Sequence, residues 1–565
     1  VPIERLATHP LDNMQNKASW SNPNIVLPRD LYGAGRKNAK GLNLSISGHL
    51  NPLLQHMHSY ETQQWSGRPW LAESISETAG SVAQIYSPFD QQQRVGEMQW
   101  TTPAQVDAAL DAAELAFPRW NATPVRERAA CLRRLADLLE EHMPELIALC
   151  AREAGKQLAD GIAEIREAVD FCRYYAQQAE EKFSTAQLLP GPTGESNELY
   201  LTGRGIFVTI SPWNFPVAIF LGQLTAALVA GNTVLAKPAE QTSLVASRCM
   251  ELIYAAGIPR DVVQLLPGKG AQIGPLLTSD PRVTGVAFTG STATAHSINR
   301  SLAARDNVAL ATLVAETGGQ NAMIVDSTAL PEQVVADIVE SSFTSAGQRC
   351  SALRVLFIQE EIAQRLLEVL TGAMAELQLG DPRDPATDVG PVIDQQAKDK
   401  LITHIEKFRQ SNQVIAETHL TTALSKGFFV APVAIKLEQL DELDSEQFGP
   451  VLHILTYKAA EIDQVIASIN RTGYGLTCGI QSRNEQFAAY LDSKLRVGNL
   501  YINRNLIGAV VGVQPFGGMG LSGTGPKAGG PHYLLRYATE RTRTINTAAI
   551  GGNASLLAQS DENTV

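Results

Sequence analysis

Short apolar runs alternate with helical periodicity between residues 205 and 325. The runs predict strands at 205–210, 233–236, 262–266, 283–288 and 309–314. The segments between them predict helices at 217–229, 243–256, 271–277 and 293–304. Strands that are apolar throughout and alternate with helices are typical of a parallel sheet covered on both faces. This is a nucleotide-binding kind of architecture.

A second alternating series begins at residues 322–325 and continues to about residue 505. It includes a predicted strand at 353–358, which follows a helical segment and a run of small residues. We therefore expect two α/β domains with a cleft between them. Cys350 lies near the start of the second domain.

Helical patterns fill the region from residue 102 to residue 183. Thr102 is a suitable N-cap with Pro103 at the first helical position, and one helical face follows it: Val106, Leu110, Ala113 and Phe117. Thr123-Pro124 repeats this start signal, and further helices are predicted at 144–154 and 157–183. These stripes are expected to be packed core faces.

Residues 1–85 are rich in Asn, Pro, Gly and Ser and lack sustained periodicity, so they predict an arm or linker. Asn22-Pro23-Asn24 and residues 31–35 have this character, and only Leu50–Met57 predicts a short helix. The chain begins with Val1-Pro2 rather than Met. We expect it to be a piece of a longer protein.

Charge and cysteine content narrow the class of protein. The 565 residues carry a net charge of −12, which argues against nucleic acid or an anionic membrane as the main partner. The six cysteines form no CxxC pair and no metal-ligand spacing with the ten histidines, so no metal site is predicted. Their spacing favours a reducing, cytoplasmic compartment. No apolar run predicts a membrane span, and no signal peptide is recognised.

Residues 343–352 surround Cys350 with small and polar side chains. Small neighbours let a substrate approach a thiol and leave backbone N–H groups free to hold an oxyanion. Cys350 is therefore a candidate nucleophile. The alternative is a small buried hydrophobic residue, the common fate of a free cysteine.

Two further candidates follow predicted strands. Asn214, between two prolines, is placed to donate to an oxyanion, with turn capping as the alternative. Glu316 lies at the junction of the two series and is a candidate general base, with a surface or ion-paired Glu as the alternative. Because α/β sheets bind ligands at the carboxyl ends of their strands, the convergence of these residues matters more than any one of them.

Three segments suit a phosphate or ribose. Residues 288–292 end a strand with Gly290 and Ser291 before a helix, whose N-terminus favours a phosphate; a plain N-cap is the alternative. Lys237 and Glu240 at the end of another strand suit ribose hydroxyls, or form an ordinary solvated turn. The Gly-rich residues 268–274 are one residue too long for the dinucleotide fingerprint, and tight strand-to-helix packing is their alternative.

Six motifs follow one another in the order and approximate spacing of the aldehyde dehydrogenase superfamily, which the chain resembles over residues 85–545. They are residues 213–215, 237–240, 288–291, 316–319, 347–350 and 446–450. Residues 349–352, 508–518 and 529–531 resemble the branch that oxidises L-glutamate γ-semialdehyde, formed from Δ1-pyrroline-5-carboxylate. Residues 23–28 and 30–33 resemble the segment that follows the flavin-containing proline dehydrogenase barrel in the bifunctional proline utilization A family.

This resemblance implies the fold and its divisions. An aldehyde-dehydrogenase-like α/β fold would have an arm at 1–85, a Rossmann-like NAD-binding domain at 86–317 and a catalytic domain at 318–505. Residues 506–565 would form a substrate-anchor loop and a C-terminal oligomerisation segment. A β-hairpin near 187–203 would pair with residues 535–550 of a partner, giving a homo-oligomer. A proline dehydrogenase domain with FAD is expected on the longer native chain.

The resemblance also implies roles in the second step of proline catabolism, the NAD-dependent oxidation of the semialdehyde to L-glutamate. Cys350 would form a thioester, Asn214 and the Cys350 N–H would hold the oxyanion, and Glu316 would activate water. The thiol would need electropositive help, since a free Cys has a pKa near 8.5. The implied cofactor residues are Lys237, Glu240, Gly290, Ser291, Glu446, Phe448 and Trp213. The implied substrate residues are Ser351, Gly508 and Ala509 for the α-carboxylate, with Phe215 and Phe516 along the methylene chain.

Some features separate this interpretation from its rivals. Glu240 would repel a 2′-phosphate, which favours NAD over NADP. Gln320 replaces a Lys that many members carry, a change expected to affect local packing. A dehydrogenase for succinate semialdehyde would have a different anchor loop. A CoA-acylating enzyme would not need Glu316, and a silent structural member would be expected to lose Cys350, Asn214 or Glu316.

Overall fold

Five parallel strands form one sheet, in the order β10-β9-β6-β7-β8. They are β6 (Ile206–Ile210), β7 (Thr233–Lys237), β8 (Val263–Leu265), β9 (Val283–Thr289) and β10 (Thr312–Glu316). The computed structural model describes residues 2–3, 7–9, 11–12, 22, 24–75 and 80–549. The first strand, β6, is central, and the chain continues to one side of it and then to the other. The strand order therefore reverses between β6 and β9, where doubly wound sheets bind their ligands.

The strand predicted at 309–314 begins three residues later than expected. Leu310 is 94% exposed, whereas β10 pairs with β9 from Thr312↔Gly285 to Glu316↔Thr289. A parallel strand needs a paired neighbour, and β9 supplies one only along this stretch. The other predicted strands of this sheet are confirmed within one or two residues.

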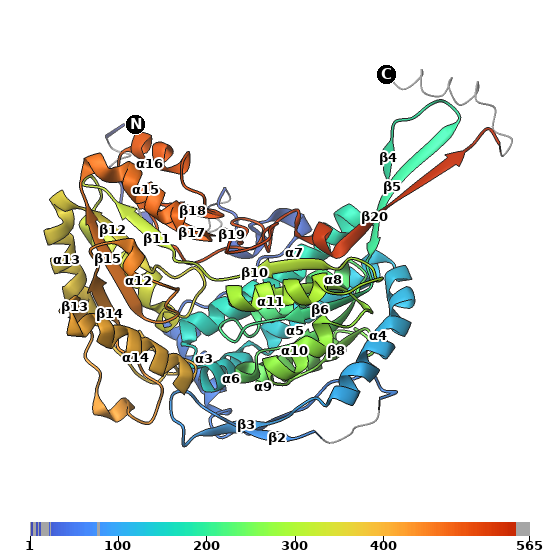
Figure 1. The fold of residues 1–565 in the computed structure, drawn as a ribbon, viewed down its shortest axis with the longest axis horizontal. Helices are drawn as coiled ribbons and strands as arrows, with labels where there is room; N and C mark the ends of the chain where they lie inside the picture. The colour runs from blue at the N-terminus through green and yellow to red at the C-terminus, as the bar shows by residue number, and fades with distance from the viewer. Residues whose placement is uncertain are drawn as a thin grey trace.

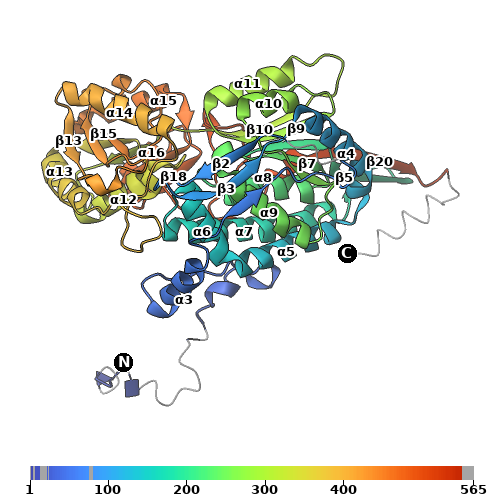
Figure 2. The same ribbon diagram turned by 90° about the horizontal axis from the view of Figure 1, so that it is seen from below.

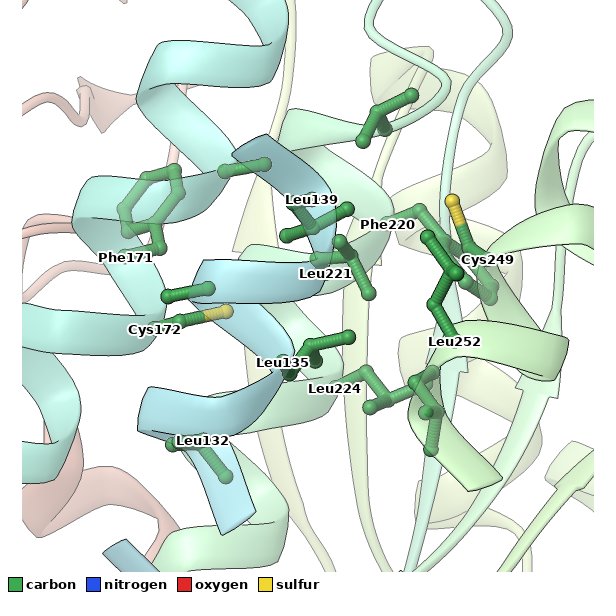
Figure 3. Packing of buried hydrophobic residues seen from close by; sticks show 14 of the residues in the cluster. Leu132, Leu135, Leu139, Phe171, Cys172, Phe220, Leu221, Leu224, Cys249 and Leu252 are labelled. Atoms are coloured by element: carbon green, nitrogen blue, oxygen red, sulfur yellow. The ribbon is translucent and has the colours of Figure 1, made fainter. Parts of the chain in front are cut away.

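Helices cover both faces of this sheet. They are α4 (Pro103–Ala122), α5 (Val125–Glu141), α6 (Met143–Ala154), α7 (Leu158–Phe183), α8 (Ala218–Val229), α9 (Ser243–Ala255), α10 (Gly270–Thr278) and α11 (Thr292–Ala303). Leucine, phenylalanine and cysteine side chains of α5, α7, α8 and α9 interlock in one core (Figure 3). This core fixes α7 and α8, the two helices that reach the functional site.

Helix boundaries confirm most of the sequence signals. Thr102 caps α4 in a capping box with Gln105, as predicted. Thr123 does not begin α5; it ends α4, and its hydroxyl donates to the Arg119 carbonyl oxygen at 3.0 Å. Pro124 is the N-cap residue of the next helix, and its side chain makes no capping hydrogen bond.

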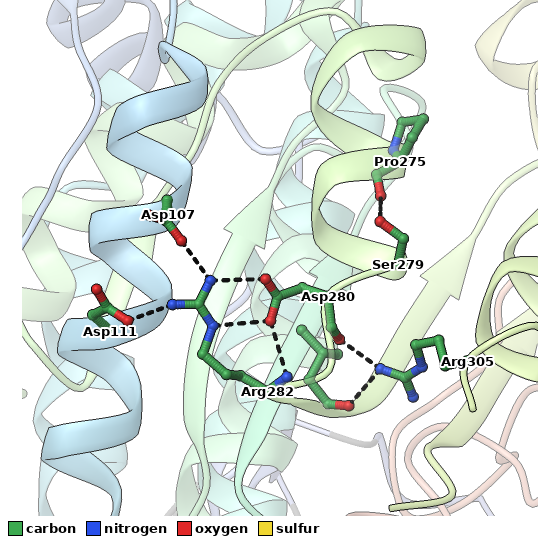
Figure 4. A network of polar contacts seen from close by, with 8 residues as sticks. Asp107, Asp111, Pro275, Ser279, Asp280, Arg282 and Arg305 are labelled. Carbon is green, nitrogen blue, oxygen red and sulfur yellow. Dashed lines mark hydrogen bonds and ion pairs between the residues drawn. The ribbon is translucent and has the colours of Figure 1, made fainter. Parts of the chain in front are cut away.

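An arginine ties α4 to the turn before β9. Arg282 contacts Asp107 and Asp111 on successive turns of α4 and also Asp280 (Figure 4). Nearby, Arg305 donates to the carbonyl oxygens of Asp280 and Val283 at 2.7 and 2.9 Å. These contacts fix the point from which β9 runs toward the site.

Seven strands form the second sheet, in the order β13-β14-β15-β12-β11-β17-β18. They are β11 (Ala322–Val325), β12 (Val355–Gln359), β13 (Val414–Glu417), β14 (Val433–Lys436), β15 (Val451–Tyr457), β17 (Thr477–Gln481) and β18 (Asn499–Ile502). All pairings are parallel except that of the edge strand β13. Around the sheet lie α12 (Pro331–Phe343), α13 (Glu360–Ala375), α14 (Gln395–Gln410), α15 (Ile462–Arg471) and α16 (Glu485–Asp492). This second α/β unit lies beside the first (Figure 1), and its buried side chains form a core of their own.

The N-terminal region is more regular than its composition suggests. The helix predicted at Leu50–Met57 is confirmed as α3 (Ser47–His58), which packs against α6 (Figure 2). A three-stranded sheet follows, in which β1 (Trp65–Gly67) pairs with β3 (Arg94–Gln99), and β3 with β2 (Val82–Tyr86). The three residues of β1 are too few to show a period in the sequence. Val1, Pro23 and residues 550–565 lie outside the described residues.

The hairpin predicted near 187–203 is present as β4 (Gln187–Leu189) and β5 (Glu195–Gly203), and it projects from the body (Figure 1). Its expected pairing with residues 535–550 of a partner stays a prediction. Within this chain, β20 (Ala538–Asn546) pairs antiparallel with β5 over nine residue pairs, from Ala538↔Gly203 to Asn546↔Glu195. The 3-10 turn Tyr533–Tyr537 packs on α8 and leads directly into β20. One edge of the hairpin is therefore occupied within the chain.

A short pair, β16 (Tyr474–Gly475) with β19 (Met519–Gly520), connects the second unit to the loop that returns to β10. The predicted boundary at residues 317–318 lies between β10 and β11, and the division into domains stays a prediction. No helix among the described residues is long and apolar enough to span a bilayer.

Candidate active site

Loops from both α/β units line one cavity at the carboxyl ends of their strands. Seven of the residues singled out from the sequence meet there: Phe215, Glu316, Cys350, Ser351, Gly508, Ala509 and Phe516. α7 and α8 close other sides of the cavity, through Phe171 and Ile219 among others. The sequence separation of these residues shows that the site exists only in the folded chain.

The segment that carries Cys350 has an unusual backbone. The turn Thr344–Gly347 holds three successive residues with positive φ: Ser345 (57°), Ala346 (53°) and Gly347 (66°). Side chains rarely adopt this conformation, so surrounding contacts must hold it. Asp160 of α7, 3% exposed, supplies two of them, a hydrogen bond from the Ser345 hydroxyl and an ion pair with Arg349. Although burial opposes ionisation, Arg349 and Lys156 keep the pKa of Asp160 below its usual value.

Carboxylates, rather than the expected electropositive group, dominate the surroundings of the nucleophile. Burial raises the pKa of the Cys350 thiol to about 12, and Glu446, Glu316 and Glu167 act in the same direction. The Ser351 backbone N–H opposes this effect. A thiol in this state is a poor nucleophile at neutral pH, so a base or a bound cation must help to remove its proton.

Asn214 lies beside the Cys350 segment and lines a small adjoining cavity with Gln348. Its side-chain amide donates to the Gln348 carbonyl oxygen at 3.1 Å. An Asn amide has two N–H donors, so one remains for another acceptor. The hydrogen bond to Gln348 orients that second donor relative to the residue two positions further along, Cys350.

A buried ion pair supports Asn214 from behind. Lys156 Nζ lies 3.0 Å from a carboxylate oxygen of Glu164 and donates to the Asn214 carbonyl oxygen at 2.8 Å. The other oxygen of Glu164 accepts from the backbone N–H groups of Val217 and Ala218, which begin α8. The loop between β6 and α8 is thus held at both its start and its end.

Glu316 ends β10 and turns into the cavity. One carboxylate oxygen accepts from the Gly518 backbone N–H at 2.9 Å, and the other is buried without a partner among the described residues. A Cβ atom at either Gly517 or Gly523 would come within 2.8 Å of this carboxylate, so glycine is needed at both positions. Burial raises the pKa of Glu316 to about 8, against the opposing effects of the Gly518 N–H and Lys527.

The residues predicted to hold an adenosine ribose and a pyrophosphate lie at the ends of β7 and β9. Lys237 is 3% exposed and donates to the Pro238 carbonyl oxygen, and burial lowers its pKa to about 8. Glu240 accepts from the Gly270 N–H at 2.9 Å, at the start of α10. Ser291 caps α11 by accepting from the Thr294 N–H, as the simpler alternative predicted, and leaves the remaining N–H groups of the first turn exposed. Packing also accounts for Gly268, where a Cβ would lie 2.6 Å from Ile273.

Glu446 and Phe448 face the first unit across the cleft. One carboxylate oxygen of Glu446 is buried without a hydrogen-bond donor among the described residues and lies 3.7 Å from Arg354, an arrangement that fits a ribose hydroxyl donor. The Phe448 ring meets the Trp213 ring edge to face at 5.6 Å. Fully buried Arg354 donates to the carbonyl oxygens of Arg349 and Gly449 at 2.9 and 3.0 Å. It thereby connects the Cys350 segment to the Glu446 loop.

The anchor loop, residues 508–518, brings unpaired backbone donors to the cavity. Within the described residues, neither the Gly508 N–H nor the Ala509 N–H donates a hydrogen bond. Consecutive free N–H groups suit a carboxylate. Ser351, 8% exposed, lines the same cavity, and Phe215 and Phe516 contribute its aromatic walls.

Two cavity residues were missed by sequence reasoning. Glu167 lies on α7 one turn from Ala163 and one turn from Phe171, and burial with the neighbouring Glu164 raises its pKa to about 7. The available signal in the sequence was a carboxylate that lies, at helical spacing, between the small Ala163 and the apolar Phe171. Gln223 of α8 donates to the Thr289 hydroxyl at 2.7 Å, and its amide oxygen is buried without a described partner. Nothing in the sequence separates it from a core glutamine.

A doubly wound sheet, a second parallel sheet, and a cavity that holds a cysteine and a buried carboxylate are typical of a nucleotide-dependent dehydrogenase. The model of the aldehyde dehydrogenase family matches residues 75–543. The chain belongs to the aldehyde dehydrogenase family.

Similar proteins refine this placement. The chain is 46% identical to "Bifunctional protein PutA" of Escherichia coli K12 over 554 residues, covering 96% of this chain but 41% of that protein. It is 36% identical to "1-pyrroline-5-carboxylate dehydrogenase" of Geobacillus sp. WCH70, covering 81% of this chain and 88% of that one. The chain therefore spans about two fifths of the length of the first relative and most of the second.

Solved structures agree. A crystal structure of bifunctional proline utilization A superposes with a TM-score of 0.87 at 48% identity, covering 98% of this chain and 52% of that chain. A variant of Thermus thermophilus 1-pyrroline-5-carboxylate dehydrogenase gives a TM-score of 0.85 at 31% identity, covering 90% and 99%. The predicted aldehyde-dehydrogenase-like fold is confirmed.

Proposed function

We propose that this chain oxidises L-glutamate γ-semialdehyde, formed from Δ1-pyrroline-5-carboxylate, to L-glutamate with NAD⁺ as the hydride acceptor. The observation that carries the proposal is the meeting of Cys350, Glu316 and the free N–H groups of the anchor loop in one cavity. A nucleophile, a base and a carboxylate site are the three features that this reaction requires. The match to 1-pyrroline-5-carboxylate dehydrogenases supports the same substrate.

The first half of the reaction forms a bond to sulfur. Cys350 loses its proton to Glu316, directly or through water, and the thiolate attacks the aldehyde carbon. The oxyanion that develops accepts from the second N–H of the Asn214 amide and from the Cys350 backbone N–H. Losing one donor of this kind typically slows catalysis by about 10²–10³. Bound nicotinamide supplies the acceptor for the hydride that leaves the same carbon, and the product on Cys350 is a thioester.

Hydrolysis completes the turnover. Glu316 first passes the proton that it took from Cys350 to solvent. It then removes a proton from water, the hydroxide adds to the thioester carbon, and the Cys350 thiolate leaves as the acid forms. The unpartnered oxygen of Glu316 is free to accept the proton. This requirement for a base distinguishes hydrolysis from transfer of the acyl group to CoA.

The cofactor residues fit NAD. Glu240 and Lys237 would bind the adenosine ribose, Gly290 and Ser291 with the start of α11 the pyrophosphate, and Glu446 the nicotinamide ribose beside Phe448 and Trp213. The carboxylate of Glu240 would repel a 2′-phosphate, which favours NAD over NADP. Lys237 is buried at the end of β7, and the charge of Glu240 partly offsets the lowering of its pKa by burial.

The substrate contacts follow from its charges. The N–H groups of Gly508 and Ala509 and the Ser351 hydroxyl would hold the α-carboxylate, and Phe215 and Phe516 would flank the methylene chain. Glu167, which lines the same cavity, would pair with the α-ammonium group when it is ionised. Such complementarity selects against aldehydes that lack both groups.

Replacing Ser351 should weaken this anchor selectively. We expect Ser351→Ala to raise KM for glutamate semialdehyde about tenfold, the value of one hydrogen bond to a charged group, and to leave KM for propanal within about twofold. Steady-state kinetics on both substrates measure this, with Ser279→Ala, on the outside of the first unit, as the matched control. Equal changes for both aldehydes would contradict a role in carboxylate binding.

The wider setting of the chain extends the proposal. We propose that residues 86–317 and 318–505 act as the cofactor and catalytic domains of a homo-oligomeric cytoplasmic enzyme in the second step of proline catabolism. The free edges of the β4–β5–β20 ribbon are a surface for self-association. A proline dehydrogenase domain with FAD on a longer chain would supply the substrate, in keeping with the bifunctional relatives.

A further inference from the structure

The N-terminal arm reaches the outer side of the anchor loop. Arg36 is 5% exposed, and two of its guanidinium nitrogens, Nη1 and Nη2, each donate to the Val511 carbonyl oxygen at 3.2 Å. More than 470 residues of chain separate the two. A peptide carbonyl with two charged donors is held more firmly than one in an ordinary loop.

The guanidinium group is itself held in place. It lies 3.7 Å from the ring centroid of Tyr32 in the arm and 5.1 Å from that of Tyr174 on α7. Asp170, one helical turn before Tyr174, accepts from the Ala39 N–H at 3.1 Å, and burial raises its pKa to about 6 against the opposing charge of Arg36. The same helix carries cavity residues, so the arm, α7 and the anchor loop share one contact region.

The loop is shaped to receive Arg36. Gly512 has φ of +77°, and a Cβ there would lie 2.9 Å from Arg36 Nη1 and 3.0 Å from the Tyr174 ring. Hydrogen bonds between Gly512 and Gly529 and between Phe516 and Ala528 also fix the loop. Arg36 adds a contact at Val511, next to Gly512, from the N-terminal arm.

We propose that Arg36 is a positioning residue for the substrate's carboxylate site. By holding the Val511 carbonyl it sets the path of the preceding residues, so that the N–H groups of Gly508 and Ala509 face the cavity together. The arm then becomes part of the machinery that distinguishes carboxylate-bearing aldehydes from simple ones. This inference rests on the proposed function, because it assigns a substrate contact to the anchor loop.

Arg36→Ala should change selectivity rather than chemistry. We expect KM for glutamate semialdehyde to rise about tenfold, since a misplaced binding group loses most of its contact, while kcat and KM for propanal stay within about twofold. Arg36→Lys, which keeps the charge but not the paired donors, should recover only part of the loss. Arg29→Ala is the matched control, because this exposed arginine of the same arm pairs only with the adjacent Asp30 among the described residues.

A second variant distinguishes loss of the contact between Arg36 and the loop from misfolding of the Arg36→Ala protein. Gly512→Ala would displace the guanidinium from the loop side without removing it, and should reproduce the selectivity change. If both changes act through one contact, the KM of the double variant for glutamate semialdehyde should not exceed that of the poorer single variant. Independent effects on KM would instead multiply. Multiplying effects, or equal losses for propanal, would overturn the inference. A wild-type enzyme that does not favour glutamate semialdehyde would instead refute the proposed function.

Discussion

Cys350→Ala is expected to lower turnover of glutamate semialdehyde by about 10⁴-fold or more, the scale seen when the nucleophile of a covalent mechanism is removed. The Kd for NAD⁺, measured by calorimetry, should stay within about threefold of the wild-type value, because the substitution leaves Lys237, Ser291 and Glu446 unchanged. The reason is chemical, because no thioester forms without the Cys350 sulfur.

A matched variant separates loss of the nucleophile from loss of any thiol. Cys478, buried in β17 of the second core, can be replaced by Ala and should leave turnover nearly unchanged. Turnover by Cys350→Ala at a tenth of the wild-type rate or above would remove this residue from the mechanism.

Glu316→Gln is the second large effect, and it should divide the reaction into its two halves. The amide can still accept from the Gly518 N–H but cannot take a proton, so thioester hydrolysis should slow by about 10²–10⁴. In a rapid-mixing experiment the NADH burst should slow less than the steady-state rate, because the Cys350 proton can still be lost to water whereas hydrolysis has no other base assigned to it. An unaltered steady-state rate would contradict the assignment of the base. Glu332→Gln, an exposed carboxylate on α12, is the control.

The pH profile carries the same information. Burial raises the pKa of Glu316 to about 8, far above its ordinary value, and a base works only when deprotonated. The hydrolysis-limited kcat should therefore rise with pH up to about 8 and then level off. In Glu316→Gln this inflection should disappear.

Much of the fold followed from local patterns. Apolar strands between helices predicted both parallel sheets, because burial on two faces leaves a continuous hydrophobic run. Thr102 with Pro103 placed the start of α4 for the same local reason. Cys350 was predicted from the small and polar residues around it, and Glu316 because it ends a strand, where parallel sheets expose side chains to ligands.

Long-range contacts escaped this reasoning. The pairing of β20 with the hairpin of its own chain depends on where the Tyr533–Tyr537 turn directs it, which no local period encodes. Glu167 belongs to a helix with several polar residues, and no local pattern shows which of them lines the cavity. Ser345 and Ala346 adopt positive φ in a turn that Asp160, from another element, helps to hold. The carboxylates around Cys350 likewise come together only in the folded chain.

Substrate selectivity tests the central claim most directly. NADH formation should be measured with Δ1-pyrroline-5-carboxylate, succinate semialdehyde and propanal, each with NAD⁺ and with NADP⁺. The account predicts a kcat/KM for the first substrate with NAD⁺ that exceeds the others by about two orders of magnitude, the combined value of anchoring a carboxylate and an ammonium group. Equal turnover of all three aldehydes would contradict it, leaving an aldehyde dehydrogenase whose anchor loop does not select the substrate.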